Sequence, residues 1–441
     1  MIGENNVSGR VENNFKEIAS ALGVKRTDME YGGVDSRVLT TSSPLTTIYV
    51  FDELKLIATN PPTIAPISFV VKSYIARPSN LPKTFLDDVS PQLDYQQYGL
   101  CSESFLPNDR KFIPAAFMLS TLPDLLVIEK AGDETLETFF EREPGKIKDT
   151  LKRLVSTNLP IFHLRVHRFH NDLLQEKKPE YSRVANRLHK DYSPLEDFLE
   201  LIDVTYSENK DKLKERATEA YAPFVRIYGR EHASICFGDF TTTNCMIDGE
   251  GNISLIDPRL YLRRQILDVS NLATSPGLNL KPEFIDELVK TYEEGREEQA
   301  GYIVKGVGIG KKISLGPELF KSQRTIAQLG VAHEAMRKLL KNLIMKNNCK
   351  KRYNDWRRDR KSFRNANEQM RKIIYGTLEY ILKYSDGFDI SKEEITGLED
   401  LTNIFFKDKS GLLVPSWIYD ENGCSNPVAN PTNLSCAPIN V

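Results

Sequence analysis

The sequence predicts an α+β protein in which short strands come first and helices follow. Apolar runs of strand length, broken by Gly, Pro and Asn, recur between about residues 25 and 130. From residue 134 onwards, long charged segments carry apolar residues at helical spacing. One further hairpin pattern interrupts the helices at residues 235–257. A chain of 441 residues has room for two or three domains with ample core.

The composition is typical of a soluble globular protein. Hydrophobic residues make up 40% and charged residues 27%, and the net charge of −2 gives no general attraction to nucleic acid or anionic membranes. No apolar run approaches the roughly 20 residues of a membrane-spanning helix, and the polar N-terminus does not resemble a secretory signal. The six cysteines lack paired spacing, which indicates reduced thiols and a cytoplasmic location.

The N-terminal region predicts a helix followed by strands. Residues 10–23 place apolar side chains on one helical face. Two strands then flank a turn in which Gly32, Gly33 and Ser36 could offer backbone N–H groups to phosphate oxygens. A plain hairpin turn is the alternative. The apolar residues 47–51 predict an additional strand or an insertion.

The next strand carries a lysine inside an apolar run. Residues 67–74 form this strand, and Lys72 is either an edge residue that prevents aggregation or a cation directed into a cleft. A helix is predicted over residues 83–99. Two paired strands over 115–120 and 125–130, around a Pro-Asp turn, complete the strand-rich region.

The most informative stretch is residues 235–257. Asp239 and Asn244 lie at the entrance of the predicted hairpin and Asp257 at its exit, so the fold can bring all three together. Two carboxylates and one amide oxygen suit hard cations such as Mg²⁺, which often share their oxygen ligands with substrate phosphates. One carboxylate can instead accept a proton from an attacking hydroxyl.

The order Gly-Asp-x4-Asn, hairpin, Ile-Asp resembles the catalytic segment of the protein-kinase-like fold. It is most similar to the branch of aminoglycoside phosphotransferases and choline kinases, whose Asp-x-x-x-Leu-Ala pattern is matched from Asp268. The resemblance implies a two-lobed fold with a small, mainly antiparallel β N-lobe and a larger helical C-lobe. It also implies that Asp239 is the catalytic base, that Asn244 and Asp257 are metal ligands, and that Asp268 braces the catalytic loop.

Two positions depart from the family pattern. Phe237 stands where this branch usually has His. Asp257 is followed by Pro258 and Arg259 instead of Phe-Gly, which favours the small-molecule branch over ordinary protein kinases.

The resemblance implies a nucleotide site around Lys72, which would hold the α- and β-phosphates. The family pairs this lysine with a Glu on the next helix, but residues 83–99 contain none. Asp94 is the favoured substitute because a helix can start at the preceding Pro91, and Asp88 and Glu103 stay open. The family's phosphate-covering loop is loosely matched by Gly32, Gly33 and Ser36, and its adenine-binding hinge falls on Glu129, Lys130 and Ala131.

Two other clusters have competing interpretations. His163, His167 and His170 share a helical face and could bind a metal, although the segment is also typical of a solvated basic helix. The basic run 350–361 could contact RNA or another polyanion, and a solvated helix face is the favoured alternative.

We therefore expect an N-lobe with an N-terminal helix over 1–130, a helical C-lobe with the catalytic hairpin over 131–300, and a helical extension with an irregular tail over 301–441. The predicted function is transfer of the γ-phosphoryl group of ATP, with Mg²⁺, to a hydroxyl of a small molecule. The alternatives are a kinase acting on protein or RNA, and a catalytically weak pseudokinase that serves as a binding module. No membrane contact is expected. The acceptor stays unidentified because acceptor pockets are built from variable elements.

Overall fold

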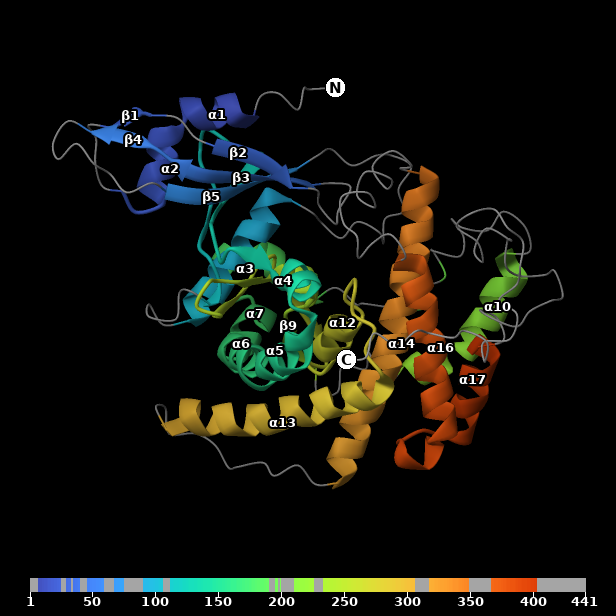
Figure 1. Cartoon of the computed structure of the whole chain (residues 1–441). Helices are drawn as coiled ribbons and strands as arrows, with labels where there is room; N and C mark the ends of the chain where they lie inside the picture. Colours follow the sequence, from blue (N-terminus) through green and yellow to red (C-terminus); the bar gives the residue numbers. More distant parts are fainter. Residues whose placement is uncertain are drawn as a thin grey trace.

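The computed structural model of the chain describes residues 7–24, 29–32, 35–39, 46–58, 67–74, 90–105, 112–189, 195–196, 199, 210–225, 233–305, 317–348 and 366–402. Within these ranges a strand-rich N-lobe lies next to a larger helical C-lobe (Figure 1). This confirms the predicted two-lobed α+β architecture.

The N-lobe is built on a five-stranded antiparallel sheet. The apolar residues 47–51 lie in the second strand of this sheet, so they form an integral strand and not an insertion. The strand order across the sheet is β2 (Asp35–Leu39), β3 (Thr46–Leu54), β5 (Ile67–Tyr74), β7 (Leu125–Glu129) and β6 (Ala116–Phe117).

Two short helices cover one face of this sheet. The single helix predicted over 10–23 is divided into α1 (Val7–Asn13) and α2 (Phe15–Ala21), because the Asn14 side chain donates to the Arg10 carbonyl and ends α1. Both helices pack against Phe69 and Val71 of β5. Since side chains alternate along a strand, Lys72 points to the opposite face of the sheet.

The Gly-Gly segment does not form the expected hairpin. β1 (Met29–Tyr31) pairs with β4 (Leu56–Ala58), and the Gly32 N–H donates to the Lys55 carbonyl at 2.8 Å. In the main sheet, the start of β2, which follows Gly32 in the chain, pairs with Asp52 near one end of β3, whereas Lys72 pairs with Ile48 near the other end of β3. Gly32 therefore lies at the end of the sheet away from Lys72, because these non-local pairings override the local turn signal. Gly33 and the side chain of Ser36 are outside the described part.

The helix after β5 begins where the proline signal placed it. α3 spans Pro91–Ser104, later than the 83–99 predicted, and residues 75–89 are not among those described. The Ser90 side chain caps the helix by accepting from the Leu93 N–H at 3.2 Å. This start places Asp94 in the first turn, where it is buried.

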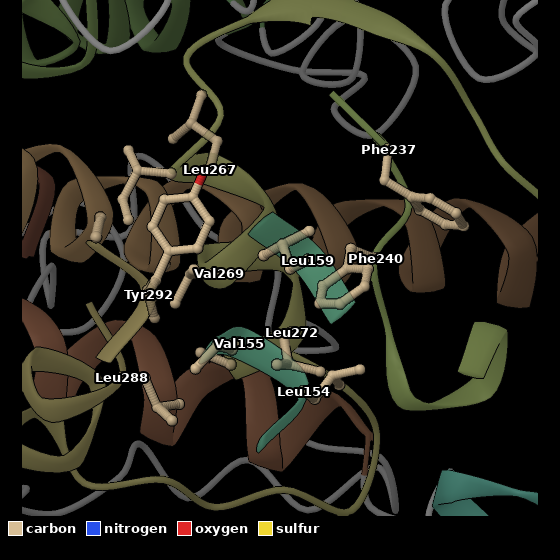
Figure 2. Packing of buried hydrophobic residues seen from close by; sticks show 14 of the residues in the cluster. Leu154, Val155, Leu159, Phe237, Phe240, Leu267, Val269, Leu272, Leu288 and Tyr292 are labelled. Atoms are coloured by element: carbon tan, nitrogen blue, oxygen red, sulfur yellow. The ribbon is translucent and has the colours of Figure 1, made fainter. Parts of the chain in front are cut away.

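The C-lobe is a set of helices around one large apolar core. The apolar face of α13 is buried in this core, and Figure 2 shows its residues Leu288 and Tyr292 in the same cluster as Val155, Val269 and Leu272. The helices are α4 (Leu136–Arg142), α5 (Ile147–Arg153), α6 (Leu159–His167), α7 (His170–Leu174), α8 (Ser182–His189), α12 (Leu267–Ala273) and α13 (Pro282–Lys305).

The C-terminal helices share this core. Ala332 of α14 and Ile374 of α16 belong to the same buried cluster as α12 and α13, and Figure 1 shows α14 running between α12 and α16. No helix in the described ranges is both long and apolar enough to cross a bilayer. The remaining helices are α10 (Lys210–Ala220), α11 (Ala222–Val225), α14 (Pro317–Asn348), α16 (Ala366–Lys383) and α17 (Lys392–Thr402).

Candidate active site

The predicted hairpin forms and lies beside the hinge. β10 (Cys245–Ile247) pairs antiparallel with β11 (Ile253–Leu255), and β8 (Glu134–Thr135) adds a third strand. Asp248 holds the turn by accepting from the backbone N–H groups of Glu250 and Asn252 at 3.0 and 2.8 Å. The hairpin therefore fixes the distance between the residues at its two ends.

At the entrance of the hairpin, Asp239 and Asn244 are in direct contact. The Asn244 side-chain N–H₂ donates to the Asp239 carbonyl at 2.8 Å and to its carboxylate at 3.1 Å. The Asn244 amide oxygen accepts no hydrogen bond from the described residues. Because the Ile256 N–H donates to the Asn244 carbonyl at 2.9 Å, Asp257 follows immediately beside this pair.

Asp268 holds the backbone that leads into Asp239. Its fully buried carboxylate accepts from the N–H groups of Phe237 and Gly238 at 2.7 and 3.0 Å. Arg263 donates to the same carboxylate at 3.0 Å and to the Gly238 carbonyl at 2.9 Å. Burial raises the pKa of Asp268, but the hydrogen bond from His163 and the charge of Arg263 outweigh burial, so its pKa falls below the usual value.

The loop conformation requires glycine at position 238. Gly238 has φ of +90°, and a Cβ there would lie 1.9 Å from the Arg259 carbonyl oxygen. This close approach follows from the pairing of β9 (Ser234–Cys236) with β12 (Tyr261–Arg263). The same pairing brings Arg263 to the Gly238 carbonyl, next to Asp239.

Phe237, where the family has His, is an apolar anchor. Its fully buried ring packs edge-on against Phe162 at 5.2 Å and Phe240 at 5.7 Å between centroids, and Figure 2 shows Phe237 and Phe240 at the edge of the C-lobe core. A histidine reaches Asp268 from α6 instead, because His163 Nε2 lies 2.8 Å from its carboxylate.

The three histidines do not form a metal site. His163 is fully buried between Asp268 and the Tyr292 hydroxyl, and His167 bonds to the Ser234 hydroxyl at 2.7 Å. No group of three potential metal ligands from His, Cys, Asp and Glu occurs within the described ranges. Because His163 is fully buried, the interpretation of this segment as a solvated helix is also wrong at this position. The spacing of the histidines did not reveal that His163 has partners in distant segments.

Between the lobes, Lys72 contacts two carboxylates. Its Nζ lies 2.7 Å from Asp94 and 2.5 Å from Asp257. Asp94 also accepts from the Tyr74 hydroxyl at 2.7 Å. Of the acids considered as partners for Lys72, Asp94 makes the contact, Glu103 instead bonds Lys178 and Tyr181, and Asp88 lies outside the described residues.

Asp257 is held as a carboxylate. Its backbone has φ of +54°, and its N–H donates to the Tyr98 hydroxyl of α3 at 2.7 Å. Burial raises the pKa of Asp257, but the nearby charges of Lys72 and Arg259 outweigh burial and lower it to about 2. Arg259, noted in the sequence only as a departure, lies 3.6 Å from Asp257 and 3.9 Å from Asp94.

The hinge residues line a shallow groove. Lys130 pairs with Asp52 at 2.8 Å, and the Glu129 N–H donates to the Ala115 carbonyl at 2.8 Å. Glu129 and Lys130 border a groove of about 330 Å³ that also includes Gly132. Lys72, Asp239 and Asp257 do not line it, so the groove alone does not locate an adenine site.

Sequence reasoning missed two cations near the segment that carries Asp239: Arg263, which donates to the Gly238 carbonyl, and Lys338, whose pKa responds to the charge of Asp239. Arg263 was missed because its partners come from separate elements: the Gly238 carbonyl, Asp268 of α12, and Glu334 of α14 at 3.7 Å. Lys338 of α14 donates to the carbonyl and hydroxyl of Thr274 at 3.1 and 2.7 Å. No local pattern in the sequence signals either contact.

The oxygen donors of this site fit a hard cation. Asp257 is ionised, and the Asn244 amide oxygen is free of hydrogen bonds from described residues. A carboxylate and an amide oxygen are suitable Mg²⁺ ligands, with phosphate oxygens completing the shell. Asp239 lies beside them, and one of its carboxylate oxygens accepts no hydrogen bond from the described residues.

No model of a protein family matches this sequence, and no curated protein matches it. Among solved structures, the chain is similar to a choline kinase from Cryptosporidium parvum at 12% identity and a TM-score of 0.48, covering 86% of this chain and 97% of the other. It is also similar to an ethanolamine kinase from Plasmodium vivax at 10% identity and a TM-score of 0.49, covering 86% and 89%.

A third similar structure is the choline kinase LicA from Streptococcus pneumoniae, at 12% identity and a TM-score of 0.41, covering 84% of this chain and 99% of the other. All three TM-scores lie below 0.5. We therefore base the functional proposal on the geometry of the site itself.

Proposed function

We propose that this protein transfers the γ-phosphoryl group of ATP, with Mg²⁺, to a hydroxyl group of a small molecule. The observation that supports this most strongly is the meeting of Lys72, from the N-lobe sheet, with three polar groups of the hairpin segment. Lys72 of β5 contacts Asp257, and Asp239 contacts Asn244 at the other end of the hairpin. A cation, two carboxylates and an amide in one place are the kinds of group that phosphoryl transfer uses, and this supports the proposal.

Lys72 would hold the α- and β-phosphates. Its ammonium is buried, and Asp94 orients it while Tyr74 and Gln97 hold Asp94 at 2.7 and 3.3 Å. When phosphates enter the cleft, the Lys72 ammonium can exchange its contact with Asp257 for phosphate oxygens. Asp94 would then keep Lys72 in place.

Asn244 and Asp257 would hold Mg²⁺, which neutralises charge on the phosphates when bound. Asp239 would orient the acceptor hydroxyl and accept its proton as the new P–O bond forms. The hydrogen bond between Asp239 and Asn244 fixes the base next to the metal ligands. Most of the rate enhancement would come from positioning and charge neutralisation.

The remaining assignments belong to the same proposal. The backbone at Glu129, Lys130 and Ala131 would bind the adenine edge, because this segment connects the sheet to the C-lobe. The cytoplasm is the expected location. The basic run 350–361, which supported a kinase acting on RNA or protein, lies beyond the described residues.

A test is Mg²⁺-dependent formation of ADP in the presence of pools of hydroxyl-bearing small molecules. We expect Asp239→Asn to lower turnover by about 10²–10⁴-fold, the usual contribution of a general base. Asp149→Asn, an exposed acid on α5, is the matched control and should keep full activity. Equal turnover in Asp239→Asn and wild type would contradict the proposed base, and transfer only to added protein or RNA would favour the alternative kinase class.

A further inference from the structure

Lys338 has hydrogen-bonding capacity that the fold does not use. An ammonium group has three N–H donors, and both described acceptors of Lys338 belong to Thr274. The third N–H finds no partner among the residues that the structure describes. The side chain is half-buried, so this donor stays open to solvent or to a ligand.

The contacts of Lys338 place it beside the catalytic loop. Thr274 follows α12, and the hydroxyl of the next residue, Ser275, accepts from the Thr242 N–H at 3.0 Å. Thr242 lies in the loop between Asp239 and Asn244. Its side-chain oxygen is fully buried and has no hydrogen-bond partner in the described part of the chain. Lys338 is therefore connected through Thr274 and Ser275 to the segment between Asp239 and Asn244.

Lys338 is a cation whose nearby carboxylate, Glu334, is paired with other cations. Burial lowers the pKa of Lys338 to about 8, although the charges of Asp239 and Glu334 raise it. Glu334 is already engaged, because it lies 3.7 Å from Arg263 and 3.6 Å from Arg337. Lys341 and Arg337 add positive charge on the same helix.

We infer that Lys338 binds an anionic group of the acceptor, so that the substrate is a hydroxyl-bearing acid, with a carboxylate or a phosphate, and not an amine. This inference rests on the proposed phosphotransferase function. The third N–H of Lys338 supplies the charged hydrogen bond. A cationic acceptor would instead place its ammonium group against Lys338, which is unfavourable in a half-buried site.

The first experiment compares three pools of acceptors by Mg²⁺-dependent ADP formation with the full-length protein. The anionic pool contains sugar acids and sugar phosphates in separate arms, the neutral pool contains sugars, polyols and nucleosides, and the cationic pool contains choline, ethanolamine and amino sugars. We expect turnover in the anionic pool at least tenfold above the other two. The two anionic arms then distinguish a carboxylate from a phosphate.

The second experiment uses variants of Lys338 on the best acceptor. Lys338→Gln should raise KM at least tenfold with a smaller change in kcat, and Lys338→Arg should restore most of the affinity. Lys321→Gln, near the start of α14, is the matched control and should behave as wild type. Thermal melting of each variant separates lost binding from lost folding, since a purely structural role would lower the melting temperature without a change in KM.

Three outcomes would overturn the inference. These are highest turnover in the neutral or cationic pool, an unchanged KM in Lys338→Gln, and Mg²⁺-dependent ATP binding without transfer to any anionic acceptor. In the third case the ATP site would survive and only the acceptor class would be wrong. Loss of ATP binding in the wild type itself would instead contradict the proposed function.

Discussion

Two charged clusters support the candidate active site, and they differ in how completely their groups are satisfied. In the cluster around Asp268, the carboxylate is fully buried and bonded to two backbone N–H groups, Arg263 and His163. In the cluster around Lys72, Asp257 is part-exposed and its acid oxygens are shared between two cations. The Asp268 carboxylate is therefore fully occupied within the fold, whereas in the proposed function the second cluster exchanges partners when a nucleotide binds.

The largest loss of stability should follow from removing Asp268, whose carboxylate is fully hydrogen-bonded within its cluster. Asp268→Ala removes the acceptor of two backbone N–H groups and leaves Arg263 partly unpaired in the core. Removing one partner of a buried ion pair costs about 3–5 kcal/mol. We expect a loss of that size in the free energy of unfolding, measured by urea denaturation. A loss below about 1 kcal/mol, the range of an exposed pair, would show that the cluster does not hold the loop.

A smaller effect on stability is expected from breaking the cluster around Lys72. Lys72→Met leaves Asp94 with the Tyr74 hydroxyl and the Gln97 amide, so the carboxylate keeps part of its hydrogen bonding. We expect a loss of about 1–3 kcal/mol, together with loss of ATP binding measured by calorimetry. If Lys72→Met were as destabilising as Asp268→Ala, the distinction between the two clusters would fail.

The smallest effect should appear in the pH dependence of stability. The pKa of Asp257 in the folded protein is about 2, below the value of 3.8 for a free side chain. Its contribution is therefore present above about pH 4 and is lost as the pH falls through about 2.

Asp257→Asn should therefore flatten the loss of stability between pH 4 and pH 2, as measured by urea denaturation at each pH. Asp149→Asn serves again as the control, because that acid is exposed on α5. Identical pH profiles for Asp257→Asn and the wild type would indicate that Lys72 and Arg259 do not hold this carboxylate in its ionised form.

The parts of the site that the sequence predicted are those with local signals. The hairpin is flanked by its own turn residues, and Asp239, Asn244 and Asp257 lie within one short stretch, so their proximity follows from chain geometry. The position of Asp94 followed from the Pro91 start signal, although the predicted helix bounds were too early.

The parts that were missed depend on contacts between distant segments. The Gly32 turn is displaced because β1 pairs with β4, which no local pattern indicates. His163 is bonded to Asp268, 105 residues away, so its helical spacing with His167 was misleading. Lys338 reaches Thr274 across 64 residues of sequence, and only the packing of α14 against α12 brings them together.

The most direct test of the proposed site is the melting temperature of the wild type and Asp257→Ala, each with ATP alone and with ATP plus Mg²⁺. A ligand that binds only the folded state stabilises it by about 2.7 kcal/mol at 100 times its dissociation constant. The account predicts a rise in the wild type that requires Mg²⁺ and is absent in Asp257→Ala. No rise in the wild type at millimolar ATP and Mg²⁺, or an equal rise in both proteins, would contradict it.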